Sequence, residues 1–128
     1  MSVRAELKLP SRPVLSHASD AVRAGGLLFL AGVLPADADG ALVGGHDVVA
    51  QASQVFDDAG AILALGGASW AEVAKLSVYL TDIDEAALVD EVRLRALGSS
   101  RPAVTVVEVP RLAVPGARVE LDAVAVVS

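Results

Sequence analysis

Three short segments of the chain are almost entirely apolar at consecutive positions, and this pattern restricts how a sheet built from them can pack. They are LLFLAG at residues 27–32, AVTVV at 103–107 and AVAVV at 123–127. The side chains of a strand point alternately to the two faces of a sheet, so each segment presents apolar groups to both faces. Both faces of the sheet must therefore be covered.

Two amphipathic helices are predicted. Within residues 46–69, apolar side chains recur at spacings of three and four, after a plausible N-cap at Asp47 and before a stop at Gly66. These apolar residues are Val48, Ala52, Val55, Ala59 and Ile62. Residues 84–98 predict a second helix that ends at Gly98.

The remaining regular segments predict strands: two within residues 21–33, then one each at 73–80, 103–109 and 119–127. The order of elements predicts an α+β fold in which two helices pack on one face of the sheet, as a single domain spanning residues 1–128. Because both helices pack on the same side, another subunit is the expected cover for the second face.

Composition excludes several classes of protein. The chain has no cysteine, and its two histidines, His17 and His46, are far apart, so no metal site is expected. With 10 basic and 16 acidic residues and 3% aromatics, nucleic-acid binding is not expected. No apolar run approaches the ~20 residues of a membrane helix, and the polar start is unlike a signal peptide. We therefore expect a soluble cytoplasmic protein without a membrane partner.

The stretch SHASD contains Ser16, His17 and Asp20, residue types that also occur in hydrolase triads. Adjacent side chains in an extended segment point to opposite sides, so Ser16 and His17 are poorly placed to act as nucleophile and base. Two interpretations stay open. The stretch is a turn built from short polar side chains, or His17 lines a pocket as a donor or proton carrier.

The last predicted strand carries the most informative carboxylates. In RVELDAVAVV, alternation places Arg118, Glu120 and Asp122 on the same face as Val124 and Val126. Burying a charge is costly unless the charge is paired or used. Either Arg118 neutralises Glu120 at a solvated strand end, or a carboxylate here orients water or carries a proton inside a pocket.

Several linked motifs together resemble the YjgF/RidA family of reactive-intermediate deaminases. They are AVRAGGLLFLAGVLPADADGALVGG, DVVAQASQVFDDAGAILALGGAS, VAKLSVYLTDID and RPAVTVVEVPRL…GARVELDAVAVV, in order from about Leu15 to the C-terminus. The resemblance implies a chorismate-mutase-like mixed sheet in a homotrimer with clefts between subunits. It also implies hydrolysis of enamines and imines to 2-keto acids and ammonia, with no metal or organic cofactor.

The family's site residues match this sequence only in part. The carboxylate that holds or activates the attacking water falls on Glu120. The arginine of the family's PAR motif, which grips the substrate carboxylate, falls on Val104, and a nearby cysteine falls on Val106. Arg101 lies three residues from Val104, about 10 Å along the strand and on its opposite face, so it is a poor substitute. Arg118 shares the face of Glu120.

Other family positions also differ. The family's serine in the second motif falls on Ala31, and the asparagine of its second helix falls on Asp90. Its N-terminal tyrosine falls on Ala18, or on His17 if the register shifts by one residue. These substitutions make the expected pocket more apolar, which favours a substrate without a carboxylate at that position.

The resemblance thus predicts a divergent RidA-like enzyme for an imine, enamine or related reactive small molecule other than the usual small 2-imino acids, with Glu120 as the catalytic residue. The expected substrate-binding residues are Val104, Thr105, Val106, Ala31, His17, Ala18, Asp90 and Arg118. One alternative is a non-catalytic trimeric module that binds a metabolite or protein. Another is a specialised enzyme that uses the same cleft for cyclisation, dehydration or tautomerisation. Ribonuclease activity, sometimes attached to this family, fits neither the acidic charge nor the missing histidine pairs.

Overall fold

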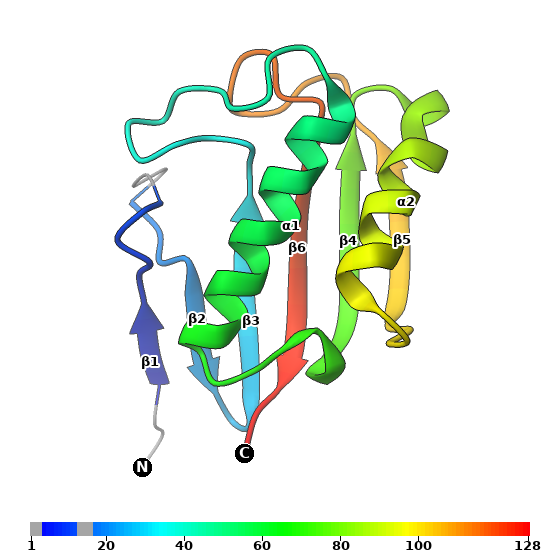
Figure 1. Cartoon of the computed structure of the whole chain (residues 1–128). Helices are drawn as coiled ribbons and strands as arrows, with labels where there is room; N and C mark the ends of the chain where they lie inside the picture. The colour runs from blue at the N-terminus through cyan, green and yellow to red at the C-terminus, as the bar shows by residue number, and fades with distance from the viewer. Residues whose placement is uncertain (1–3, 13–16) are drawn as a thin grey trace.

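The computed structural model describes residues 4–12 and 17–128, and forms one mixed sheet with two helices on one face (Figure 1). The strands are β1 Arg4–Leu7, β2 Ala21–Ala24, β3 Leu27–Val33, β4 Val73–Leu80, β5 Ala103–Glu108 and β6 Val119–Val126. The helices are α1 Val48–Leu65 and α2 Ala86–Leu97. Two 3₁₀ turns, Trp70–Glu72 and Ile83–Glu85, precede β4 and α2. The α+β prediction is confirmed, whereas Leu15 and Ser16 lie outside the described residues.

The strands are ordered β1-β2-β3-β6-β4-β5 in the sheet. All neighbouring pairs are antiparallel except β4 and β5, which are parallel and joined by α2. A parallel pair needs such a crossover because its strands run in the same direction. The last strand, β6, therefore lies between β3 and β4.

The first helix has the predicted ends. The carboxylate of Asp47 accepts hydrogen bonds from the amides of Val49 and Ala50, which otherwise lack partners in the first turn. Gly66 ends the helix, and its amide bonds to carbonyls of the last turn. A Cβ on Gly66 would lie 2.4 Å from Leu28, so glycine also lets β3 pack closely against this helix end.

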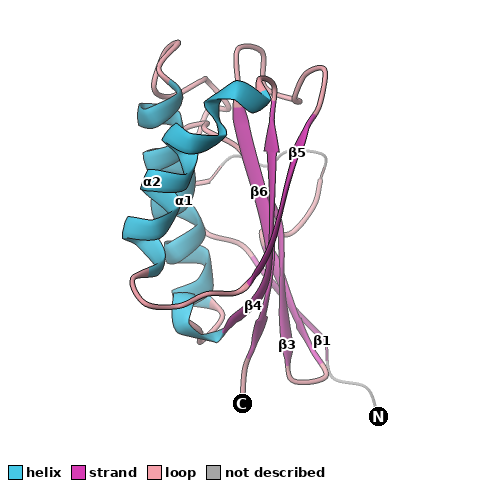
Figure 2. Cartoon of the chain, turned by 90° about the vertical axis from the view of Figure 1, so that its right-hand side faces the viewer, coloured by secondary structure: helices cyan, strands magenta, loops and turns pink. Residues whose placement is uncertain are grey.

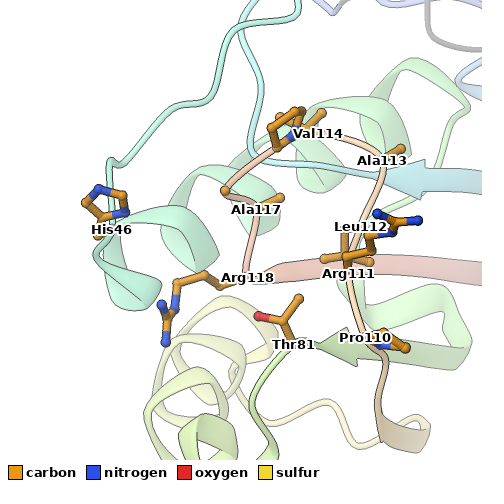
Figure 3. Close-up of a pocket in the computed structure, with 11 residues that line it drawn as sticks. His46, Thr81, Pro110, Arg111, Leu112, Ala113, Val114, Ala117 and Arg118 are labelled. Atoms are coloured by element: carbon orange, nitrogen blue, oxygen red, sulfur yellow. The ribbon is translucent and has the colours of Figure 1, made fainter.

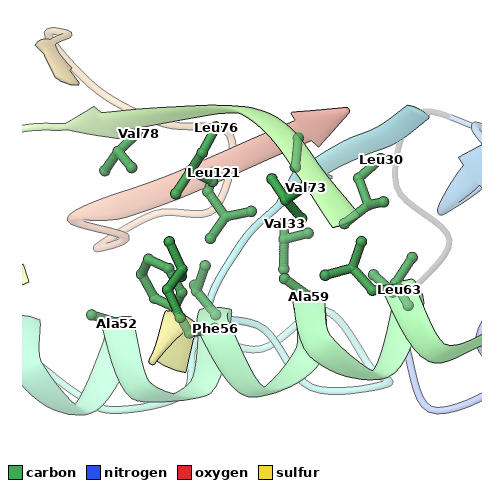
Figure 4. Packing of buried hydrophobic residues seen from close by; sticks show 14 of the residues in the cluster. Leu30, Val33, Ala52, Phe56, Ala59, Leu63, Val73, Leu76, Val78 and Leu121 are labelled. Atoms are coloured by element: carbon green, nitrogen blue, oxygen red, sulfur yellow. The ribbon is translucent and has the colours of Figure 1, made fainter. Parts of the chain in front are cut away.

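The main core fills the space between the helices and the sheet (Figure 4). Leu28, Leu76 and Leu121 come from three neighbouring strands and are fully buried against α1. Helix α1 contributes Val48, Ala52, Val55, Phe56, Ala59, Ile62 and Leu63 to this cluster. The period-three-and-four pattern in the sequence thus corresponds to the face of α1 that lies on the sheet.

In the described part of the chain, no helix covers the other face of the sheet (Figure 2). On this open face the side chains of Phe29, Val107 and Val126 are 42%, 39% and 52% exposed. Phe29 and Val124 are paired across β3 and β6, which makes the apolar surface continuous between neighbouring strands. The strands do offer apolar groups to both faces. That another subunit covers the open face stays a prediction.

Two buried polar residues tie loops to the core. The guanidinium of Arg12 donates to the carbonyls of Leu34 and Ala36 and forms an ion pair with Asp58, with an N–O distance of 2.7 Å. Gln51 is fully buried on α1 and makes three hydrogen bonds: it donates to the carbonyls of Gly45 and Gly116 and accepts from the amide of Arg118.

Neither helix of the described chain has the length and apolar character that crossing a membrane requires.

Candidate functional site

Glu120 lies near the start of β6 on the open face of the sheet. Its neighbours Val119 and Leu121 point into the core, so the strand's alternation turns Glu120 to the opposite side. The side chain is half-buried, and this burial raises the pKa of Glu120 above its ordinary value, with a further increase from the negative charge of Asp122. A carboxyl with a raised pKa exchanges protons nearer to neutral pH, which suits acid–base chemistry.

Tyr79 of β4 completes a polar cluster beside Glu120. Tyr79 is paired with Glu120 in the sheet register, and its hydroxyl donates a 2.8 Å hydrogen bond to Asp122. That hydrogen bond, together with desolvation, raises the pKa of Tyr79. The cluster therefore combines a carboxyl that can be protonated or ionised with a phenol held to a second carboxylate.

A β-bulge in β3 lies next to this cluster. Leu30 pairs with Ala123 and Val33 with Leu121, so two residues of β3, Ala31 and Gly32, face a single residue of β6. The amide of Ala31 bonds instead to the carbonyl of Asp20, at 3.0 Å. Bulges of this kind often lie beside active sites, where they redirect side chains.

Three of the predicted site residues come together around a cavity of about 430 Å³ next to the bulge. Ala31 lies at its β3 side, and His17 and Ala18 line it from the preceding loop. His17 has φ of 53°, in the left-handed region that is uncommon for a residue other than glycine. The structure thus brings Ala31, His17 and Ala18 together. Ala31 is followed in sequence by Gly32, and the Glu120 carboxylate lies against the backbone of Gly32.

Val104 and Val106 lie on the other face of the sheet. They pair with Leu76 and Val78 of β4 and pack against the main core beneath α1 and α2. Asp90, on α2, is half-exposed and pairs with Arg93 at 3.3 Å. Within one chain these residues are separated from Glu120 by the thickness of the sheet.

Thr105 points away from Val104 and Val106. It is exposed on the open face, where the ammonium of Lys75 donates to its hydroxyl at 2.5 Å. The predicted binding residues of β5 are therefore divided between the two faces of the sheet.

The two arginines considered in the sequence have structural partners. Arg118 forms an ion pair with Glu85, at 2.8 and 2.9 Å from two guanidinium nitrogens, so the interpretation in which Arg118 neutralises Glu120 is wrong. Arg101 donates to the carbonyls of Gly98 and Ser100, at the end of α2. These contacts give Arg101 a structural role after the end of α2.

A cavity of about 720 Å³, larger than the one beside the bulge, is formed mainly by the loop before β6 (Figure 3). Its lining includes His46, Thr81, Arg111 and Arg118, but Glu120 is not part of it. In Figure 3 the side chains of Arg111 and Arg118 point in different directions, and the contacts above assign Arg118 to Glu85. Size alone therefore does not make this cavity the candidate site.

Among residues 4–12 and 17–128, no group of three or more His, Cys, Asp or Glu side chains is arranged to hold a metal ion. Tyr79 and Gly32 were not singled out from the sequence, because their relation to Glu120 depends on which strands are neighbours and in which register. Alternation within VAKLSVYL could have placed Tyr79 on the open face, but only the pairing of β4 with β6 places it beside Glu120.

Comparisons with known proteins agree over most of the chain. A family model described as Endoribonuclease L-PSP matches residues 10–127. A RutC family protein of Pyrococcus horikoshii is 40% identical over 107 residues, covering 84% of each chain. A 2-iminobutanoate/2-iminopropanoate deaminase of Capra hircus is 37% identical over 109 residues, covering 84% of this chain and 78% of the relative. The crystal structure of RidA from an Antarctic Psychrobacter has a TM-score of 0.87 at 30% identity, covering 96% of this chain and 99% of that one.

Proposed function

The chain belongs to the YjgF/RidA family, and from this premise we propose that it hydrolyses an imine, an enamine or a related reactive small molecule other than the usual small 2-imino acids. The observation that carries this proposal is the half-buried Glu120, whose raised pKa and position beside the bulge of β3 suit proton transfer to and from water. Glu120 is also the carboxylate that matches the family's catalytic position.

The reaction needs only water and a proton carrier. Ionised Glu120 accepts a proton from a water molecule as the water oxygen forms a bond to the carbon of the protonated C=N group, which gives a carbinolamine. Glu120 then donates this proton to the carbinolamine nitrogen. The hydroxyl group loses its proton to solvent as the carbonyl forms, and the C–N bond breaks to release ammonia. An enamine first gains a proton at its β-carbon. Glu120 ends each cycle in its starting state.

The substrate class follows from Val104 and Val106, which offer no charge to a substrate carboxylate. A charged hydrogen-bonded contact contributes about 1.5 to 3 kcal/mol, so its absence weakens recognition of a 2-imino acid roughly 10- to 150-fold. Ala31 and Ala18 make the cavity beside the bulge more apolar as well. A less polar substrate without a carboxylate at that position fits these residues better.

The proposal includes assembly into a homotrimer with sites between subunits. Two observations support it: the open face exposes Phe29 and Val126, and the predicted binding residues lie on opposite faces of one sheet. A cleft between copies can place the Val104 side of one subunit next to the Glu120 side of another. No organic cofactor or metal is part of this mechanism.

A binding module is the second candidate. The substitutions at positions 104, 106, 31 and 18 favour it, because they remove the polar groups that the family uses to hold its substrate. Such a trimer would bind a metabolite or a partner protein in the same clefts without turnover. The two functions differ in one measurable respect, since only the enzyme depends on the acid–base chemistry of Glu120.

The test generates several imines in situ with an amino-acid oxidase or dehydratase and traps unhydrolysed imine with semicarbazide. Carboxylated and uncarboxylated substrates are compared, with wild type beside Glu120→Ala. Wild type should lower the trapped imine, most strongly for uncarboxylated substrates, and Glu120→Ala should not. Asp57→Ala, an exposed carboxylate on α1 on the helix side of the sheet, controls for general effects of losing a carboxylate. Equal trapping with and without protein for every substrate contradicts the enzymatic function.

A further inference from the structure

Gly32 occupies a position where its backbone does not require glycine. It lies within β3, and its φ is outside the left-handed region that eight other glycines of the described chain adopt. An alanine would meet no conformational penalty there. The reason for glycine must therefore be sought in the space around it.

The Glu120 carboxylate occupies the place where a side chain of Gly32 would be. A Cβ on Gly32 would lie 1.9 Å from Oε2 of Glu120, 3.0 Å from its Cδ and 3.6 Å from its Cγ. The nearest of these contacts is far shorter than two non-bonded atoms allow. A side chain at position 32 and the present Glu120 carboxylate would therefore occupy the same space on the open face.

The bulge is held in place independently of Glu120. The amide of Ala31 bonds to the carbonyl of Asp20, and the Asp20 carboxylate in turn accepts from Lys8 and the amide of Leu9. The backbone of Gly32 is therefore a fixed surface for Glu120 to lie on. Ala31, one residue away, faces the cavity that His17 lines.

We propose that Gly32 is a positioning residue: its missing side chain lets the Glu120 carboxylate lie against the bulge of β3, beside the cavity lined by Ala31. This inference rests on the proposed role of Glu120. A methyl group at position 32 would force the carboxylate to rotate away from β3 toward solvent. Because the displaced atoms are the end of a flexible side chain, the fold can absorb the change, and the effect falls on catalysis.

Gly32→Ala tests the proposal through readouts that fold stability alone does not move. With an imine that wild type hydrolyses, we expect kcat/KM to fall roughly 10- to 100-fold, as a misplaced catalytic group does. The pKa of Glu120, followed by NMR titration of its carboxyl carbon, should move down toward its ordinary value. Thermal unfolding should stay close to wild type. Gly60→Ala, a helix glycine with only an ordinary contact to Trp70, is the matched control and should change neither readout.

Shortening the carboxylate gives a second test. In the Gly32→Ala background, Glu120→Asp retracts the colliding oxygens, so the double variant should lose less activity than the two single losses multiplied together. An unchanged pKa and kcat/KM in Gly32→Ala, with Glu120→Ala inactive, overturns the positioning role alone. Full activity of Glu120→Ala overturns the proposed function itself, so the two failures are distinguishable.

Discussion

Glu120 and Val104 lie on opposite faces of one sheet, with β4 between their strands. Glu120 pairs with Tyr79 on the open face, while Val104 pairs with Leu76, which is buried beneath the helices. A single ligand cannot touch both within one subunit. A site that uses both residues would have to be built from two copies of the chain, so the proposed catalysis depends on the proposed assembly.

Restoring the family's arginine should change the substrate preference. Val104 is partly exposed on the edge strand β5, so the longer side chain of Val104→Arg can extend past the sheet edge into solvent. We expect activity on the 2-imino acid formed from 2-aminoacrylate to rise roughly 10- to 150-fold, measured by semicarbazide trapping. Val104→Met adds length without charge and should not reproduce the gain. Equal effects of the two variants would show that the carboxylate is not recognised at this position.

The acid limb of the pH profile should depend on Asp122. In the proposed mechanism ionised Glu120 is the active form, so activity should be lost as the pH falls through the raised pKa of Glu120. Asp122→Asn removes a neighbouring negative charge, which lowers the pKa of Glu120 and moves the acid limb of kcat/KM to lower pH. Tyr79→Phe removes the hydrogen bond to Asp122 but keeps the negative charge of Asp122, so the acid limb of kcat/KM should not move to lower pH. A limb that moves upward in Asp122→Asn would contradict this account.

The open face should control assembly. Phe29→Glu places a charge in the apolar surface beside Val124. Burying that charge in an interface is unfavourable. In addition, each subunit loses the burial free energy of the aromatic side chain, about 1.5 to 3 kcal/mol. Light scattering should show a shift from trimer to monomer at micromolar concentration. Leu88→Glu, equally exposed on α2, is the control and should leave the trimer intact. A stable wild-type monomer would refute assembly through this face.

Gln51 should be important for stability. In Gln51→Leu the carbonyls of Gly45 and Gly116 and the amide of Arg118 lose their buried partner. Each unsatisfied group costs about 1 to 3 kcal/mol, so we expect the free energy of unfolding to fall by about 3 kcal/mol or more in a denaturant titration. Gln54→Leu loses one half-buried bond to Asp58 and should cost about 1 kcal/mol or less. Equal losses in the two variants would exclude this role for Gln51.

The sequence was sufficient where local pattern determines structure. The apolar spacing and the residues Asp47 and Gly66 predicted α1 with its ends, and alternation alone predicted that apolar side chains lie on both faces of the sheet. Strand β1 was not predicted, because RAEL is short, polar and almost fully exposed at the sheet's edge. Edge strands of this kind are held by backbone pairing, which leaves little trace in side-chain pattern.

The candidate site was harder to predict from the sequence, because it depends on contacts between residues that are distant in sequence. Arg118 was expected beside Glu120 from alternation, yet Glu85, 33 residues earlier, binds its guanidinium. The relation of Gly32 to Glu120 required both the register of β3 against β6 and the bulge that interrupts it. The sequence determines these strand pairings through folding, but they cannot be inferred from its local periodicity.

The position of β6 also has a consequence for how the chain reaches its folded state. It follows the other five strands in sequence but joins β3 to β4 in the sheet, so until it is in place the β1–β3 and β4–β5 portions share no strand pairing. The strand that carries Glu120 is thus also the strand that unites the sheet. Until β6 pairs with both neighbours, the sheet lacks the strand between β3 and β4, and Glu120 lacks its pairing with Tyr79, so the candidate site requires the complete sheet.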